Sequence, residues 1–339
     1  PTSTTIPTVS LKMLLSGTCR PLDGTCDMRL TEYVDEILAS GFPALRGLTP
    51  RGRRFQLDSY LRNAVDRDVP EQGLKVRRPE SMLAWLRAYA AATSTTANYS
   101  QILDAATPGH GEKPARGTSI AYRDVLTSLW LLDPVPAWIP TGSFLTRLGR
   151  TPKHHLADPA LAARLLRLDR GALLDGVGTA IGPQTGTLLG NLFESLVTLC
   201  VRVPAQAAEA ELAHMRTRNG DHEVDLVVIR DDGRVLAIEV KLANTVPDSD
   251  VRHLRWLGEQ LGDRLIDSII INTAALPPTG ARTVSASCPS VCSPRSRPIP
   301  SQARAHSAER SLADFDSIMS ATPREGLIFL SLLIPSGLT

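Results

Sequence analysis

The fold is decided by residues 223–241, Glu-Val-Asp-Leu-Val-Val-Ile-Arg-Asp-Asp-Gly-Arg-Val-Leu-Ala-Ile-Glu-Val-Lys, where two β-branched runs of strand length flank an Asp-Asp-Gly turn. This pattern predicts a β-hairpin. Side chains alternate along a strand, so Glu239 and Lys241 share one face of the return strand. If the loop comprises residues 231–233, Asp225 lies directly opposite Glu239; a two-residue loop shifts the register by one and separates the two carboxylates.

The three-residue loop would bring two carboxylates together across the ladder, where they repel unless a cation lies between them. The same register places Glu223 opposite Lys241. A helix expected at residues 188–203, just upstream, has a polar face that includes Glu194 and can aim this side chain at the hairpin. Taken alone, a glutamate on such a helix is usually a solvated residue.

Length and composition set broad limits. A chain of 339 residues can form two or three domains with substantial cores. Its net charge of +2 gives no global argument for nucleic-acid binding. Five scattered cysteines argue against a disulfide framework and fit a reducing compartment, so we expect a cytoplasmic protein. No stretch approaches the roughly 18 uninterrupted apolar residues of a membrane helix, so no membrane partner is expected.

The sequence predicts an α/β protein, α+β overall, with a helical and winged-helix N-terminal part. The expected segments are an irregular lead-in (1–28), a helical segment (29–79), a winged helix-turn-helix (80–140), an α/β domain (141–276), a disordered Pro/Ser/Arg-rich segment (277–310) and an uncertain tail (311–339). The first residue, proline, is compatible with processing or with a missing N-terminal portion.

The winged-helix segment shows helical patterns near 80–92, 99–106 and 119–132. Asn98 or Ser100 can cap the second helix, and Thr118 or Ser119 the third. In the third helix the residues expected to face the core are Ile120, Val125, Leu126, Leu129 and Trp130. The cations expected on the outside are Lys113, Arg116 and Arg123, which could position the helix on phosphates. A purely connecting role remains the alternative.

Residues 141–170 are the most basic window, with six Lys or Arg residues against two aspartates. From this window Arg147, Arg150 and Lys153 join Lys113, Arg116 and Arg123 as candidate nucleic-acid contacts. We interpret the adjacent pair His154 and His155 as surface or hydrogen-bonded side chains, because neighbouring residues point in different directions and no further ligand motif follows.

Several of these stretches resemble one known family. The resemblance is carried by Gly190–Glu194, Arg216–Gly220, Glu223–Val227 and Ile238–Lys241, and upstream by Gly41–Pro43, Tyr60–Asp68, the winged-helix stretch and Lys153–Asp158. Over roughly residues 30–273 the chain is similar to a prokaryotic AAA-type ATPase family that ends in a PD-(D/E)xK nuclease-like domain of unknown function. The resemblance implies a restriction-endonuclease-like fold for the α/β domain.

The chain departs from that family in three ways. It contains no G-x-x-x-x-G-K-[ST] phosphate loop, so no ATP site is expected in this chain, and residues 29–79 would be a helical remnant of the ATPase module or lid. The loop at 219–222 is one residue longer than usual. After Asn272 the Pro/Ser/Arg-rich segment replaces a closing strand and looks like the product of a reading-frame shift.

The family resemblance also implies chemistry for the site. Asp225, Glu239 and Glu194 would hold Mg²⁺ or Mn²⁺, and Lys241 would orient or help deprotonate a water in phosphodiester hydrolysis. The implied partners are DNA and an ATPase subunit or upstream chain. The alternative is a catalytically silent DNA-binding, scaffold or regulatory protein, in which these side chains form only ion pairs.

Overall fold

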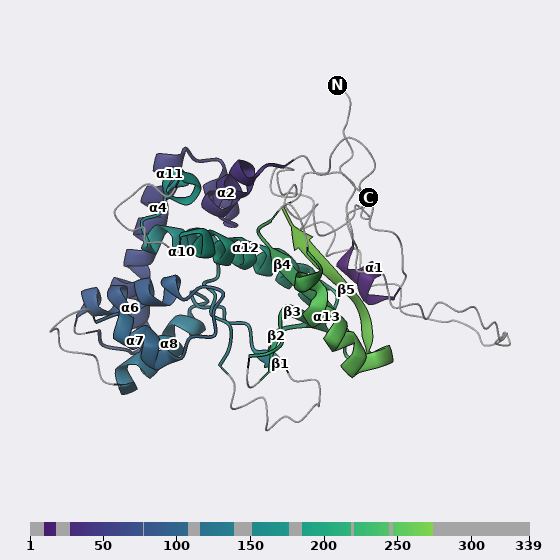
Figure 1. The fold of residues 1–339 in the computed structure, drawn as a ribbon. Helices are drawn as coiled ribbons and strands as arrows, with labels where there is room; N and C mark the ends of the chain where they lie inside the picture. Colours follow the sequence, from purple (N-terminus) through teal and green to yellow (C-terminus); the bar gives the residue numbers. More distant parts are fainter. Residues whose placement is uncertain are drawn as a thin grey trace, which may run out of the picture.

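The computed structural model describes residues 10–17, 28–76, 78–107, 116–138, 151–175, 185–217, 220–243 and 247–273. A helical part lies beside a five-stranded mixed sheet (Figure 1). The expected fold class, α/β with a helical N-terminal part, is confirmed. The expected disordered segment and tail, residues 277–339, lie outside the described residues.

The helical part follows the predicted periodicities closely. Its elements are α2 (Leu30–Ala39), α3 (Pro43–Arg46), α4 (Pro50–Asn63), the π-helical turn η1 (Ala64–Asp68), α5 (Val69–Glu71), α6 (Pro79–Ala91), α7 (Tyr99–Ala105), α8 (Arg116–Ser128), α10 (Pro159–Leu165) and α11 (Arg170–Asp175). The predicted cap of the second winged-helix element is confirmed, since the Asn98 side chain accepts from the backbone N–H of Gln101 at 2.9 Å.

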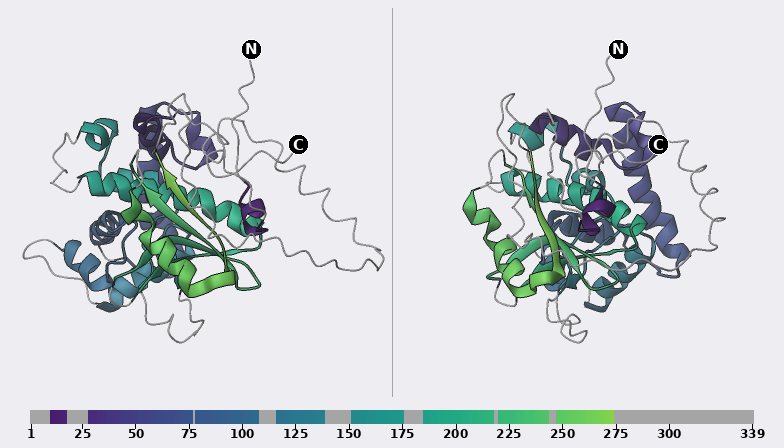
Figure 2. Two further views of the ribbon diagram at one scale, coloured as in Figure 1. Left: turned by 45° about the vertical axis from the view of Figure 1, so that its right-hand side comes forward. Right: turned by 90° about the vertical axis from the view of Figure 1, so that its right-hand side faces the viewer.

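The sheet order is β1 (Ala137–Trp138), β2 (Glu211–Arg216), β3 (Glu223–Ile229), β4 (Val235–Lys241) and β5 (Leu265–Asn272). The two outer pairs are parallel and the two inner pairs antiparallel. Helix α12 (Thr185–Ala207) covers one face and α13 (Asp248–Leu261) the other, followed by the 3₁₀ turn η2 (Gly262–Arg264) (Figure 2). The C-terminal elements therefore run in the order helix, three strands, helix, strand.

The hairpin has the three-residue loop. Leu226 pairs with Ile238 and Ile229 with Val235. Arg230 N donates to Arg234 O at 2.9 Å, and the loop closes at Gly233, whose φ of +75° suits a residue without a Cβ. Continued by one more pair, this register sets Asp225 opposite Glu239.

Helix α2 ends at a residue with a positive φ. Ser40 takes the positive φ, 70°, and its hydroxyl together with the Gly41 N–H donates to Asp158 Oδ2. The next residue, Gly41, lies where a side chain has little room, because a Cβ there would be 3.0 Å from Leu199 Cδ2. Asp158 also accepts from Ala160 N at 2.7 Å and so joins the end of α2 to the start of α10.

The prediction for residues 116–132 needs three corrections. Helix α8 has already begun at Arg116, and Ser119 lies inside it, where its buried hydroxyl accepts from Trp85 Nε1 at 2.8 Å. Ile120 and Trp130 are 42% and 75% exposed and do not face the core. The helix ends at Ser128, and the left-handed backbone of Trp130 (φ 55°) follows it, so the helical spacing used for Trp130 no longer applies.

Two stretches expected to be irregular are ordered against the sheet. The apolar run at 11–15 forms helix α1 (Leu11–Leu15), whose Leu15 carbonyl accepts from Arg230 Nη1 at 2.6 Å. Residues 137–138, expected in a wing or linker, form strand β1. Residues 132 and 135 make antiparallel bridges to 156 and 153, so the segment that follows α8 is held by the chain just before α10.

Candidate functional site

A buried lysine lies at the centre of the acidic cluster. Lys153 Nζ is 2.8 Å from Glu194 Oε1 on α12 and 2.9 Å from Asp225 Oδ1 on β3. A third carboxylate oxygen, Glu223 Oε1, is 3.4 Å away. The lysine is only 1% exposed. The protein's own ammonium group thus neutralises Asp225 and its acidic neighbours, whereas the cation bonded to Glu239 is Lys241.

The backbone fixes Lys153 in this place. Its N–H donates to Val135 O and its carbonyl accepts from Val135 N, both at 2.9 Å. This arrangement corrects the prediction that Lys153 contacts nucleic acid, because a side chain buried among carboxylates cannot reach a phosphate. The many basic residues of 141–170 suggested a solvated surface, but the side chain of Lys153 points into the protein.

Asp225 occupies a β-bulge. Ala213 pairs with Val227 and Met215 with Val224, so the two residues Asp225 and Leu226 oppose the single residue His214 on β2. Bulges re-aim side chains and are common beside functional sites. Here Asp225 Oδ1 accepts from Lys153, while Oδ2 accepts from the backbone N–H of Val240 at 2.9 Å. Both carboxylate oxygens are thus held in fixed directions.

Glu239 and Lys241 form the second half of the site. Lys241 Nζ donates to Glu239 Oε1 at 2.7 Å, in agreement with the prediction that they share one strand face. Glu239 is buried, and its other oxygen makes no hydrogen bond within the described part of the chain. Lys241 is about half-buried and so joins the cluster to the surface.

Burial and mutual repulsion determine the protonation of the cluster. Burial raises the pKa of Glu194 to about 8, and the positive charge of Lys153 only partly opposes this. Burial and the negative charge of Asp225 raise the pKa of Glu239 to about 7. Burial would also raise the pKa of Asp225, but Lys153 and the Val240 N–H reverse the effect and lower it. Asp225 is therefore the permanently ionised partner of Lys153.

This donor set does not fit the expected Mg²⁺ or Mn²⁺. A divalent ion needs several carboxylate oxygens free to converge on it. The Oδ1 of Asp225 and the Oε1 of Glu194 converge instead on Lys153. Within the described ranges, no three His, Cys, Asp or Glu side chains are grouped so that they could hold a metal ion.

The structure brings together all four residues proposed for catalysis. Glu194 and Asp225 meet at Lys153, and Glu239 and Lys241 lie close enough to influence Asp225 electrostatically. Sequence reasoning missed the central role of Lys153. One signal was present: only five of the 37 basic residues are lysines, and two of those five, Lys153 and Lys241, are in this site.

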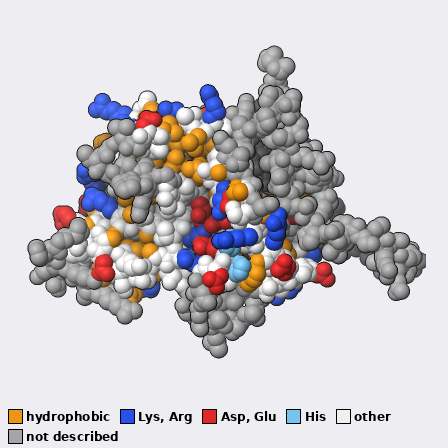
Figure 3. Space-filling view, in the orientation of Figure 1, with side chains coloured by type: hydrophobic (Ala, Val, Ile, Leu, Met, Phe, Trp, Pro, Cys, Tyr) orange, Lys and Arg blue, Asp and Glu red, His pale blue; other side chains and the backbone are white. Residues whose placement is uncertain are grey.

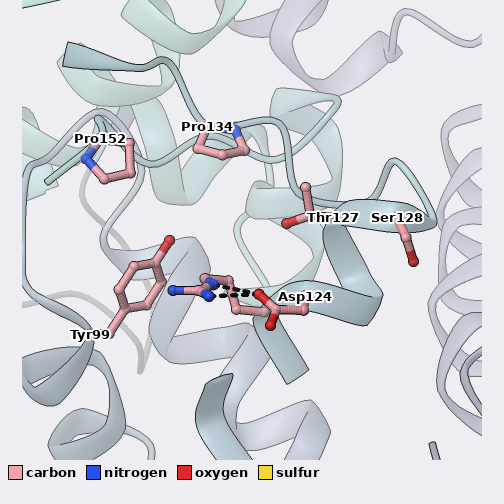
Figure 4. Close-up of a pocket in the computed structure, with 7 residues that line it drawn as sticks. Tyr99, Asp124, Thr127, Ser128, Pro134 and Pro152 are labelled. Atoms are coloured by element: carbon pink, nitrogen blue, oxygen red, sulfur yellow. Dashed lines mark hydrogen bonds and ion pairs between the residues drawn. The ribbon is translucent and has the colours of Figure 1, made fainter. Parts of the chain in front are cut away.

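The other candidate nucleic-acid contacts are scattered. Lys113, Arg147, Arg150 and the side chain of Arg116 lie outside the described residues. Arg123 lies 5.3 Å from the ring centroid of Tyr99 and donates to Asp124 at 2.6 Å. With Thr127, Ser128 and the facing Pro134 and Pro152, these side chains line an open pocket of about 520 Å³ between α8 and the 134 and 152 segments (Figure 4).

Much of the charge in the basic window is compensated. Arg164 makes two bonds to Asp58 of α4, at 2.5 and 2.8 Å, and Arg170 Nε lies 2.9 Å from Asp35 of α2. These pairs attach α10 to α4 and α11 to α2 within the helical part.

Near the centre of the face drawn in Figure 3, acidic, basic and histidine side chains gather over the region of β4 and α13. The outward side of α13 carries Arg252 and Arg255, both exposed, at a spacing of three residues. Lys241, which is bonded to Glu239 of the acidic cluster, also acts electrostatically on His253, the neighbour of Arg252.

Helix α12 is long and apolar enough, from Thr187 to Ala207, to cross a membrane. Its side chains Leu192, Phe193 and Val197 are instead buried against the sheet and the helical part. The apolar composition is thus explained by a central core position.

Two known families match separate parts of the chain. Residues 30–171 match a domain of unknown function, DUF8612, and residues 189–287 match another, DUF4143, which is often found with AAA-type ATPases. No curated protein and no solved structure matches the chain. The first match runs through α10 and ends within α11, whereas the second begins in α12 and includes all of the acidic cluster except Lys153.

Proposed function

We propose that this chain is a catalytically silent nucleic-acid-binding protein whose C-terminal domain has a nuclease-like fold. The observation that carries the proposal is the position of Lys153 Nζ between Glu194 and Asp225, at 2.8 and 2.9 Å. The order helix, three strands, helix, strand supports the likeness to PD-(D/E)xK domains, as do Asp225 and Glu239 on adjacent strands with Lys241 two residues further on.

The argument against hydrolysis is chemical. Metal-assisted cleavage of a phosphodiester needs a cation that can bind a phosphoryl oxygen and acidify a water. An ammonium group can neutralise the carboxylates, but it cannot supply a coordination site. Because Lys153 is 1% exposed and its backbone is bridged to Val135, substrate does not reach it in this conformation.

The argument for nucleic-acid binding is electrostatic. The cations Lys241, Arg252 and Arg255 belong to β4 and α13, which are regular elements of the sheet layer. Positively charged side chains on a fixed scaffold bind phosphates without regard to sequence. On the helical part Arg123, Arg164 and Arg170 are bonded to aspartates, as Lys241 is to Glu239, whereas Arg51 and Arg54 of α4 are exposed at the same spacing of three residues and are the alternative phosphate contacts.

A second candidate function is metal-dependent phosphodiester hydrolysis. It is favoured by the hairpin register, which sets Asp225 opposite Glu239, and by the Lys241–Glu239 contact of 2.7 Å. This function would require Lys153 to leave Asp225.

The proposal also includes a partner, an AAA-type ATPase in the cytoplasm. It is supported by the DUF4143 match and by the lack of a phosphate-loop motif in this chain.

One experiment separates these candidates. The purified chain is incubated with labelled single-stranded and duplex DNA in millimolar Mg²⁺ or Mn²⁺, and both binding, by fluorescence anisotropy, and cleavage, by gel, are measured. We expect binding that weakens steeply with salt and no cleavage. Cleavage that is lost in both Asp225→Asn and Lys241→Ala would establish the second candidate, and absence of binding at low salt would refute the first.

A further inference from the structure

The edge of the acidic cluster carries an aromatic stack. His222, which precedes β3, lies parallel to the indole of Trp256 on α13, with ring centroids 4.1 Å apart and an interplanar angle of 7°. His253 approaches His222 edge-on, at 5.5 Å and 85°. All three side chains are only partly buried, so the stack lies at the surface.

A chain of polar contacts orients the stack. Arg252 Nε donates to His253 Nε2 at 3.1 Å. The proton of a neutral His253 is then on Nδ1, which faces His222 Nδ1 at 3.4 Å. Burial and the nearby positive charge of Arg252 lower the pKa of His253 and favour this neutral form. The His222 ring is therefore held on one face by Trp256 and at its edge by His253.

Charged residues of both signs surround the same group: Asp221 is exposed next to His222, and Glu223 acts on His253 against the nearby cations. Arg252, Arg255 and Trp256 occur at positions i, i+3 and i+4 of α13 and so share its outward face. Lys241 is close enough to His253 to influence its protonation electrostatically. Figure 3 shows histidine, hydrophobic and Lys or Arg side chains side by side in this region.

We propose that the His222–Trp256 stack binds an unpaired base of single-stranded nucleic acid, with Arg252, Arg255 and Lys241 on the flanking phosphates. This inference rests on the proposed function and specifies its ligand class. Aromatic rings between cations are the usual means of binding single strands without sequence readout. In a duplex the base faces are already stacked and hydrogen-bonded, so a stacking surface favours unpaired bases.

The fluorescence of the Trp256 indole can be used to measure binding. Of the four tryptophans, Trp85 and Trp138 are buried, and Trp130 is 75% exposed. In a Trp130→Phe protein, Trp256 is therefore the remaining indole that a ligand can reach. Titration with oligo(dT) should quench its emission, whereas a duplex of equal length should quench it much less.

The decisive comparison uses His222→Ala against His222→Phe. The alanine removes the stacking partner and should weaken oligo(dT) binding on the order of tenfold, whereas phenylalanine keeps a ring and should retain most of the affinity. Thermal melts of both variants establish that they are folded. Unchanged oligo(dT) affinity in a folded His222→Ala protein, or equal affinity for duplex and single strand, would overturn this inference and leave the proposed function standing. If the parent protein binds no oligonucleotide, both this inference and the proposed function are overturned.

Discussion

Lys153 Nζ lies 2.9 Å from Asp225 Oδ1, and both residues are buried although 72 positions separate them in the sequence. The pair joins the segment that precedes α10 to the bulge of β3. It is at once the centre of the acidic cluster and a connection between the helical part and the sheet.

Removal of the ammonium should strongly destabilise the protein. We expect Lys153→Met to lower the free energy of unfolding by about 3–5 kcal/mol, because it leaves buried carboxylates without a counter-ion. Chemical denaturation measures the change. In the double variant Lys153→Met/Asp225→Asn part of the stability should return, since the remaining charge is also removed; additive losses would contradict the assigned pair.

Glu194 should make stability fall as pH rises. Its pKa is raised to about 8 in the folded state, against about 4.5 when unfolded, so the folded state holds one more proton between these values. Stability from this group is thus complete below pH 4.5 and is lost toward pH 8, with a slope of at most about 1.4 kcal/mol per pH unit. Glu194→Gln should flatten this part of the stability profile, measured by urea unfolding; an unchanged slope would mean that Glu194 is ionised throughout.

His214, which lies opposite the bulge, should make the protein less stable as pH falls. Burial and the positive charge of Lys153 lower the pKa of His214 to about 3. The unfolded chain therefore takes up the proton first, and stability falls as pH drops from about 6.5 toward 3. Burial likewise lowers the pKa of His155, whose two ring nitrogens have no hydrogen-bond partner among the described residues.

A neutral aromatic replacement tests this assignment. We expect His214→Phe to reduce the acid-induced loss of stability between pH 6.5 and 3, followed by circular dichroism at each pH. His222→Phe serves as the control for the replacement itself, because the His222 ring is only partly buried and already stacks on Trp256. Equal profiles for both variants and the parent would show that His214 does not drive the acid transition.

Gly41 should resist substitution because of space. A Cβ at this position would meet Leu199 Cδ2 at 3.0 Å, so we expect Gly41→Ala to cost about 1–3 kcal/mol through overpacking at the contact of α12 with the end of α2. Gly47→Ala is the matched control: its φ is −75° and nothing lies within 4 Å of the added methyl group. Comparable melting temperatures for the two variants would disprove the close approach.

The sequence by itself determined the features that depend on neighbouring residues. The Asp-Asp-Gly loop and the strand period of two limited the hairpin to two registers, and the one with a three-residue loop, which faces Asp225 with Glu239, is present. The helical pattern near 99–106 gave α7, and the side chain of Asn98 gave its start. In each case the decisive interaction spans only a few residues.

Only the tertiary structure decided what the site contains. The basic run around Lys153 is compatible with a solvated surface, and its burial follows from contacts with α12 and β3 that lie 41 and 72 residues away. The bulge at Asp225 arises from pairing with β2, and the exposure of Trp130 from the end of α8 two residues earlier. Such outcomes depend on how whole elements pack, because a buried charge is stable only where the fold supplies its partners.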